Sequence, residues 1–237
     1  MDDDLSYSME ARVRVALSAS AAQVSATAAS LVPTHDESGC PRGELAELAG
    51  RLVDTAGEAL TYAVSCERRR GTTWERIAEV LNEDVAAVRR RFEEPVARLD
   101  RNLVAAWLDP DRADPLPEGA GDPAGSAARL DEWLTGDARR DDAFWHHPDA
   151  EIREHPVGSG LTAMSPIEHY ELLASASEMI DEDGHDREAL ISLHRRRIAL
   201  LEWLLAEELL DPGIGEDVDE DTLRTLLRVA RRRLARL

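Results

Sequence analysis

Lysine is absent from this sequence, and all 28 basic residues are arginine. Aromatic residues make up only 4% of the chain, and its two cysteines, Cys40 and Cys66, form no CxxC pair. A β-sandwich core uses many aromatic and β-branched residues, so this composition favours helices packed through Leu, Val and Ala. The isolated cysteines offer no disulfide framework, and we expect them to be reduced thiols.

Recognisable catalytic motifs are also missing. The sequence contains no glycine-rich phosphate loop, no nucleophile elbow and no HExxH pair. His147, Glu151 and His155 have the spacing of ligands on one helix face, but Pro148 and Pro156 interrupt any such helix. We therefore expect a polar loop there, no metal site, no cofactor and no catalytic residue, and we expect that the protein is not an enzyme.

No apolar run is long enough to span a bilayer, and no secretory signal is visible. Asp2, Asp3 and Asp4 open the chain, whereas a signal peptide begins with basic residues. These features predict a cytoplasmic protein that does not interact with membranes. The net charge of −20 also opposes unassisted binding to nucleic acid.

The positive charge is concentrated in two places. Residues 67–101 carry nine arginines against eight acidic residues, and residues 222–237 carry six arginines and no acidic residue. The second group could bind DNA or an acidic partner. It could equally complement the dipole of its own helix, which favours cations at the C-terminal end.

The spacing of apolar residues predicts an all-α fold. Leu45, Leu48, Leu52 and Leu60 recur at intervals that place them on one helix face. Similar stripes, bounded by capping residues, recur along the chain, and no stretch alternates as a strand would. The expected helices are residues 9–31, 44–70, 73–81, 85–92, 95–108, 127–134, 165–180, 187–210 and 222–237. Pro95 either kinks a helix or starts a new one.

One segment stands out as a boundary between domains. Residues 110–125 combine Pro110, Pro115, Pro117 and Pro123 with three glycines and several Asp. Such a composition is typical of a linker. We therefore predict a helical region over residues 1–109 and a helical interaction or dimerisation region over residues 126–237.

Residues 71–92 read GTTWERIAEVLNEDVAAVRRRF and predict two short helices joined by a tight turn. Gly71 ends the preceding helix, Thr72 and Glu75 have capping-box spacing, and Asp84 can cap the second helix. Asn82 suits the turn because Asn accepts a left-handed backbone. We expect Trp74 to be buried against the second helix. The expected core residues are Trp74, Ile77, Ala78, Leu81, Val88 and Phe92.

This segment resembles the helix-turn-helix of high-GC bacterial regulators and sigma-like domains. Those commonly show a Gly-x-Ser/Thr-Trp start, Ile-Ala in the first helix, Leu-Gly at the turn and an apolar-x-x-Arg-Phe finish. The present chain departs from that pattern at the turn, where Asn82 replaces glycine and Glu83 replaces an apolar residue. The resemblance covers only residues 71–92. It implies a DNA-associated, transcription-related regulatory protein, expected to be a homodimer bound to double-stranded DNA.

The resemblance also indicates which residues would contact DNA. These are Thr73, Arg76, Val85, Ala86, Arg89, Arg90 and Arg91. Val85 and Ala86 occupy the base-reading positions and carry no hydrogen-bonding side chain, whereas the arginines can reach phosphates. The alternative is a protein–protein adaptor that keeps the fold without reading DNA. Val85 and Ala86 favour the adaptor, and the arginines and caps favour DNA.

Overall fold

The computed structural model describes residues 7–32, 41–136, 147–183, 187–206 and 220–237. Three expectations from sequence lie outside these residues. They are the reduced thiol expected at Cys40, the last turn of the helix predicted over 187–210 and the acidic residues that open the chain. The following description concerns the described residues alone.

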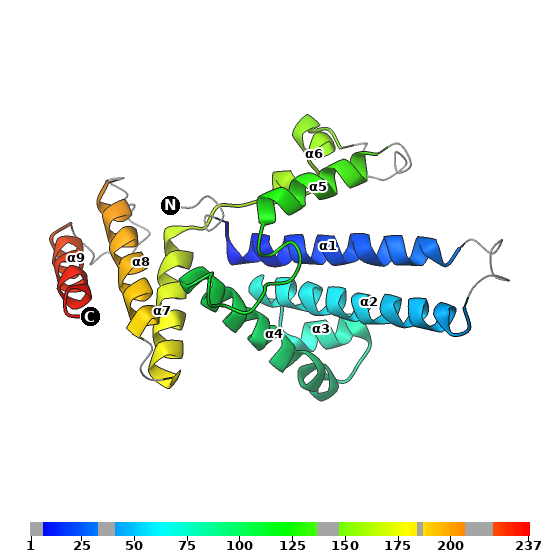
Figure 1. The fold of residues 1–237 in the computed structure, drawn as a ribbon, viewed down its shortest axis with the longest axis horizontal. Coiled ribbons are helices and arrows are strands. Elements are labelled where there is room, and N and C mark those ends of the chain that lie inside the picture. Colours follow the sequence, from blue (N-terminus) through cyan, green and yellow to red (C-terminus); the bar gives the residue numbers. More distant parts are fainter. Residues whose placement is uncertain (1–6, 33–40, 137–146, 184–186, 207–219) are drawn as a thin grey trace. The chain divides into compact units, whose positions relative to one another are not determined.

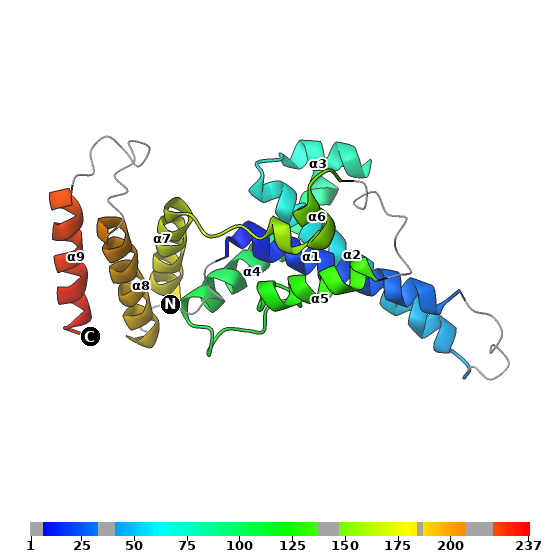
Figure 2. The same ribbon diagram turned by 90° about the horizontal axis from the view of Figure 1, so that it is seen from above.

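The described residues confirm the all-α fold class (Figures 1 and 2). Their only β-like contact is an isolated bridge between Tyr7 and Ala163. None of the described helices combines the length and the apolar content needed to cross a bilayer. The α-helices are α1 (Met9–Ser30), α2 (Glu44–Arg69), α3 (Trp74–Leu81), α4 (Val85–Leu108), α5 (Pro123–Thr135), α6 (Ala150–Glu154), α7 (Pro166–Asp183), α8 (Arg187–Ala206) and α9 (Glu220–Leu234), and a 3-10 helix, η5, spans Gly158–Gly160.

Four elements differ from the sequence-based expectation. Helix α4 continues through Pro95, because the buried side chains of Phe92 and Val96 hold the backbone on either side. Helix α5 begins at Pro123, inside the expected linker, where Asp122 caps it through the N–H of Gly125. Proline suits this first helical position, since its missing N–H would have no helical partner there. The short helices α6 and η5 had not been predicted.

The chain divides into two compact units, and the division differs from the predicted domains. Unit 1 comprises Met1–Leu99 and Pro115–Ala163, and unit 2 comprises Asp100–Asp114 and Met164–Leu237. Residues 115–125 therefore belong to unit 1 and do not link the two units. The physical reason is that this segment packs on α1, as described next.

In unit 1, α1 and α2 run antiparallel along each other, and α5 packs on α1 (Figure 1). Arg12 of α1 is buried, and its Nη1 donates a hydrogen bond to the carbonyl of Ala120 over 2.7 Å. Gly119 has a φ of +92°, and a Cβ at this position would lie 2.9 Å from the carbonyl oxygen of Val15. The Pro/Gly segment is thus docked on α1 through its small residues.

We predict that Gly119→Ala lowers the free energy of unfolding by about 1–3 kcal/mol, because an alanine there is strained in φ and also meets the α1 backbone. Chemical denaturation would measure the effect. Gly121→Ala is the matched control, since a Cβ at Gly121 has only an ordinary contact, at 3.9 Å. Equal stability of the two variants would show that residues 115–125 do not dock on α1.

In unit 2, helices α7, α8 and α9 lie side by side, each antiparallel to the next (Figures 1 and 2). Leu223 and Ala230 of α9 are buried against Leu201 of α8, with Ile198 and Leu227 at the edge of this cluster. The last turns of α4 also belong to this unit. There Trp107 is only 2% exposed and contacts the ring of His169 of α7 edge to face.

Candidate functional site

The candidate site is the pair of helices α3 and α4, which the sequence singled out. Both helices begin at side-chain caps. Thr73 accepts the N–H of Arg76 at 3.3 Å, and Asp84 accepts the N–H of Ala86 at 2.9 Å. The Asp84 cap is confirmed. The capping-box prediction was one residue out of register, since Thr72 instead donates its hydroxyl proton to Glu67 of α2.

The turn between the two helices has the geometry expected of Asn82. This residue adopts a left-handed conformation, with φ 53° and ψ 41°. The N–H of Asn82 bonds to the carbonyl of Glu79, and the N–H of Glu83 bonds to the carbonyl of Ala78. These bonds satisfy the last carbonyls of α3 and end the helix sharply. Glu83 lies exposed at the turn.

A small core fixes α3 and α4 against the end of α2. Val88 and Phe92 of α4 are 0% and 2% exposed, and they meet Ile77 and Ala78 of α3 and Val64 of α2. A small residue at Ala78 allows a close approach of the neighbouring helix. All the expected core residues contribute, although Trp74 and Leu81 remain at its margin. Val85, expected to read bases, also packs at this margin.

Trp74 is only partly buried, although the sequence predicted burial against the second helix. One side of the indole packs on the core, and the guanidinium of Arg68 lies over the ring at 4.7 Å from its centre. Arg68 also donates a hydrogen bond from Nη1 to the carbonyl of Thr72. A cation over an indole stabilises both groups. The contact ties the last turn of α2 to the start of α3.

The first turns of α4 present a mixed face to solvent. Ala86, Arg89 and Arg90 are exposed, whereas Val85 is half-buried and packs on the core. Of the two positions expected to read bases, only Ala86 therefore faces outward. Its methyl group can contact a thymine methyl and nothing more specific.

Glutamates neutralise most of the arginines predicted to contact DNA. Arg76 pairs with Glu79 at 2.6 Å, Arg89 with Glu75 at 3.4 Å, and Arg91 with Glu83 at 3.0 Å. Arg90 has no ion pair among the described residues. The sequence did not predict these pairs, because two of the three join residues on different elements.

The pair between Glu75 and Arg89 is supported by the surroundings of the carboxylate. Hydrogen bonds from its own backbone N–H and from the Thr73 hydroxyl hold the pKa of Glu75 below its ordinary value, and Arg89 adds to this effect. Glu75 is therefore a stable anion at neutral pH. All of these charges are exposed, so water and salt screen them strongly.

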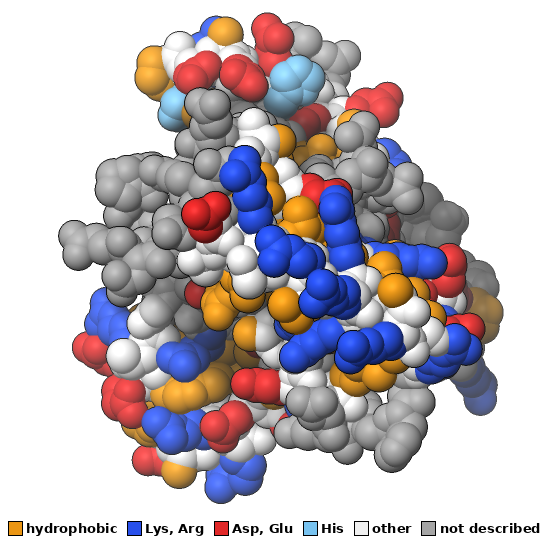
Figure 3. Space-filling model, turned by 90° about the vertical axis from the view of Figure 1, so that its left-hand side faces the viewer, with side chains coloured by type: hydrophobic (Ala, Val, Ile, Leu, Met, Phe, Trp, Pro, Cys, Tyr) orange, Lys and Arg blue, Asp and Glu red, His pale blue; other side chains and the backbone are white. Residues whose placement is uncertain are grey.

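Helix α9 offers a second basic surface, in unit 2. Its buried residues pack on α8, while its arginines are exposed, with Leu226 and Val229 exposed between them at 49% and 42%. Figure 3, which views the molecule from the side of α9, shows arginine side chains gathered with hydrophobic side chains between them. Arg231 pairs with Glu202 of α8. The remaining arginines can complement the helix dipole or meet an anion.

The described residues contain no group of three or more His, Cys, Asp or Glu side chains placed to hold a metal ion. His155 approaches the buried carboxylate of Asp131 at 3.6 Å. That carboxylate accepts the N–H groups of Val157 and Gly158 and thereby fixes the loop before η5. On α3 and α4, the groups available for binding are exposed guanidiniums, which bind phosphates and carboxylates.

Comparison with family models, with curated proteins and with solved structures finds no match to this chain.

Proposed function

We propose that the end of α2, α3 and α4 form a helix-turn-helix unit that associates this protein with double-stranded DNA, in a regulatory and non-enzymatic role. The observation that carries the proposal is the small core of Val64, Ile77, Ala78, Val88 and Phe92. It holds two capped helices in a fixed relation and leaves the first turns of α4 free. An exposed helix of this kind can enter a major groove about 12 Å wide.

Binding would depend on phosphates, because the outer face of α4 carries little that can read bases. Ala86 offers a methyl group, and Arg89 and Arg90 offer guanidiniums that suit phosphate oxygens. Arg89 must leave Glu75 to reach a phosphate. Exposed ion pairs contribute only about 0–1 kcal/mol, so a duplex with its dense negative charge can compete for the arginine.

Sequence specificity would require two copies of the chain. We propose a cytoplasmic homodimer in which two α4 helices lie about 34 Å apart, one turn of the duplex. Our candidates for the dimer contact are the helices at residues 9–31 and 187–210.

Charge reversal on α4 tests the proposal. We expect the double variant Arg89→Glu, Arg90→Glu to weaken binding to a duplex at least about tenfold at low salt, since two attractive charges become repulsive. Fluorescence anisotropy with a labelled duplex would measure this.

The matched control carries Arg42→Glu and Arg51→Glu, two exposed arginines of unit 1 outside α3 and α4. This control has the same net charge as the α4 variant. Its affinity for the duplex should lie within about twofold of that of the unmodified protein. If both variants weaken binding equally, net charge alone governs the interaction and the assignment to α4 is wrong.

A protein–protein adaptor is the second candidate, and the ion pairs of Arg76, Arg89 and Arg91 favour it. A surface already neutralised by its own glutamates attracts phosphates weakly. The same face carries Val80 of α3, which is 69% exposed and could contact another protein. Absence of duplex binding even at low salt would favour this function.

A further inference from the structure

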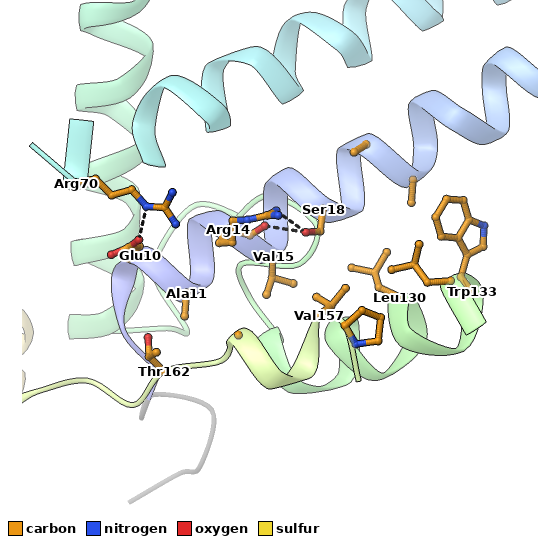
Figure 4. A pocket seen from close by; sticks show the side chains of 15 residues that line it. Glu10, Ala11, Arg14, Val15, Ser18, Arg70, Leu130, Trp133, Val157 and Thr162 are labelled. Carbon is orange, nitrogen blue, oxygen red and sulfur yellow. Dashed lines mark hydrogen bonds and ion pairs between the residues drawn. The ribbon is translucent and has the colours of Figure 1, made fainter. Parts of the chain in front are cut away.

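Unit 1 contains a cavity that the DNA-association proposal does not use. It has a volume of about 690 Å³ and lies between α1, α5 and the loop at residues 156–162 (Figure 4). Small-molecule sites are typically about 300–1,000 Å³ and mostly apolar, with a few convergent polar groups. Its apolar walls are Ala11, Val15 and Ala22 of α1, Leu130 and Trp133 of α5, and Val157.

The walls are held in place by contacts between the lining residues and their immediate neighbours. Asp131, on the turn of α5 next to Leu130, is 5% exposed and accepts the N–H of Val157 at 2.7 Å. This bond fixes the loop wall relative to α5. On the other side of the cavity, Val15 of α1 is 2% exposed, so close packing holds its side chain in place. The cavity is therefore largely preformed, which lowers the entropic cost of binding a ligand.

Polar groups converge at one end of the cavity only. Arg14 of α1 donates a hydrogen bond from Nη1 to the hydroxyl of Ser18 at 2.7 Å. Arg70, which follows α2, donates from Nε to Glu10 at 2.9 Å. Figure 4 shows this polar end around Arg70, Glu10 and Arg14, with Trp133 at the opposite end. The lining of this end holds two guanidiniums and one carboxylate, and Arg70 also lies 4.0 Å from Glu67, which is outside the lining. Arg14 is therefore the cation at this end that has no carboxylate partner among the described residues.

The arrangement also sets the length of a suitable ligand. From Arg14, the lining residues of α1 continue to Ala22. At about 1.5 Å per residue this distance is roughly 12 Å along the helix. A ligand that reaches from the arginines to Trp133 must therefore be elongated, with its charge at one end.

We propose that this cavity binds an elongated amphipathic carboxylate, with its carboxylate at Arg14 and Arg70 and its apolar body along α1 toward Trp133. Arginine suits a carboxylate because the guanidinium offers paired donors in a planar fork. Arg14 has no ion pair among the described residues, and Arg70 can exchange the Glu10 carboxylate for that of the ligand. The site is independent of the proposed DNA association.

Calorimetric titration of the full chain with decanoate tests the proposal, with decanol and decylammonium as probes of equal chain length. Decanoate should bind, decanol should bind about tenfold more weakly, and decylammonium should not bind, because Arg14 repels a second cation. Equal binding of decanoate and decanol would overturn the proposal, as would no binding of decanoate.

Two substitutions with opposite expected effects locate the carboxylate. Arg14→Gln should weaken decanoate binding about fivefold to tenfold, whereas Glu10→Gln should tighten it, because it removes the competing anion. Arg51→Gln, an exposed arginine of α2 outside the cavity, is the matched control and should change nothing. Arg14 is exposed, so its replacement leaves the fold intact. If Arg14→Gln and Arg51→Gln bind decanoate alike, the carboxylate does not lie at Arg14 and the proposal fails.

Discussion

Replacing Phe92 by alanine should lower the free energy of unfolding of unit 1 by about 3–5 kcal/mol, the range for large aromatic truncations in a core. Phe92 is 2% exposed and is among the largest fully buried side chains of the described residues. Its ring lies where α4 meets α3 and α2, so the variant leaves a cavity between three helices. Urea denaturation followed by far-UV circular dichroism would measure the loss.

Two other substitutions in α3 serve as comparisons for the stability loss of Phe92→Ala. Val80→Ala removes an apolar side chain of α3 that is 69% exposed and should change stability by less than about 0.5 kcal/mol. Trp74→Ala should cost less than Phe92→Ala, because Trp74 is only partly buried and its other side faces Arg68. A loss at Phe92 no larger than that at Val80 would mean that the core joining α2, α3 and α4 does not form.

In unit 2, Trp107→Ala should have an effect of similar size, about 3–5 kcal/mol. Trp107 is 2% exposed, and the guanidinium of Arg196 lies 4.5 Å from the centre of its ring. Burial lowers the pKa of Arg196 to about 10, against a smaller opposing effect of Asp109. Removing the indole costs both the apolar contact and the cation–π contact. Thermal unfolding would measure the loss.

Trp107→Phe separates these contributions. The indole N–H of Trp107 is buried without a hydrogen-bond partner among the described residues, so phenylalanine removes no hydrogen bond and keeps a ring beneath Arg196. We expect this variant to retain most of the stability lost in Trp107→Ala. If the two variants are equally unstable, the ring does not support Arg196 as described.

Local patterns in the sequence were enough to predict the helices and the core of the candidate site. The cap at Asp84, the left-handed turn at Asn82 and the buried Val88 and Phe92 all depend on residues within a few positions of one another. Such interactions follow from helix periodicity and capping chemistry. The capping position of α3 was misplaced by one residue because Thr72 and Thr73 offer the same hydroxyl.

Contacts between distant parts of the chain could not be predicted in this way. The composition of residues 110–125 is that of a linker, yet Ala120 accepts a hydrogen bond from Arg12, 108 residues earlier. A glycine in a flexible segment and one that lets two backbones touch, as Gly119 does at Val15, look identical in a sequence. The predicted domain boundary failed to anticipate this docking.

The ion pairs of the candidate site and the cavity of unit 1 also depend on contacts between residues on different elements, which the sequence does not reveal. Arg89 and Glu75 lie on different helices, and their pairing depends on how α3 crosses α4. The cavity is bounded by α1, α5 and the loop that Asp131 fixes, which are far apart along the chain. Arg14 and Trp133 gave no sequence signal of a shared site, because neither belongs to a local motif.

Titration of a labelled duplex with the full chain, repeated from about 20 to 200 mM salt, tests the proposed DNA association most directly. We predict a Kd on the order of 10⁻⁴–10⁻⁶ M at physiological salt, which tightens steeply as salt is lowered because each phosphate contact releases counterions. The double variant Arg89→Glu, Arg90→Glu should lose most of this salt dependence along with its affinity. No binding at the lowest salt, or binding that salt does not change, would contradict the account.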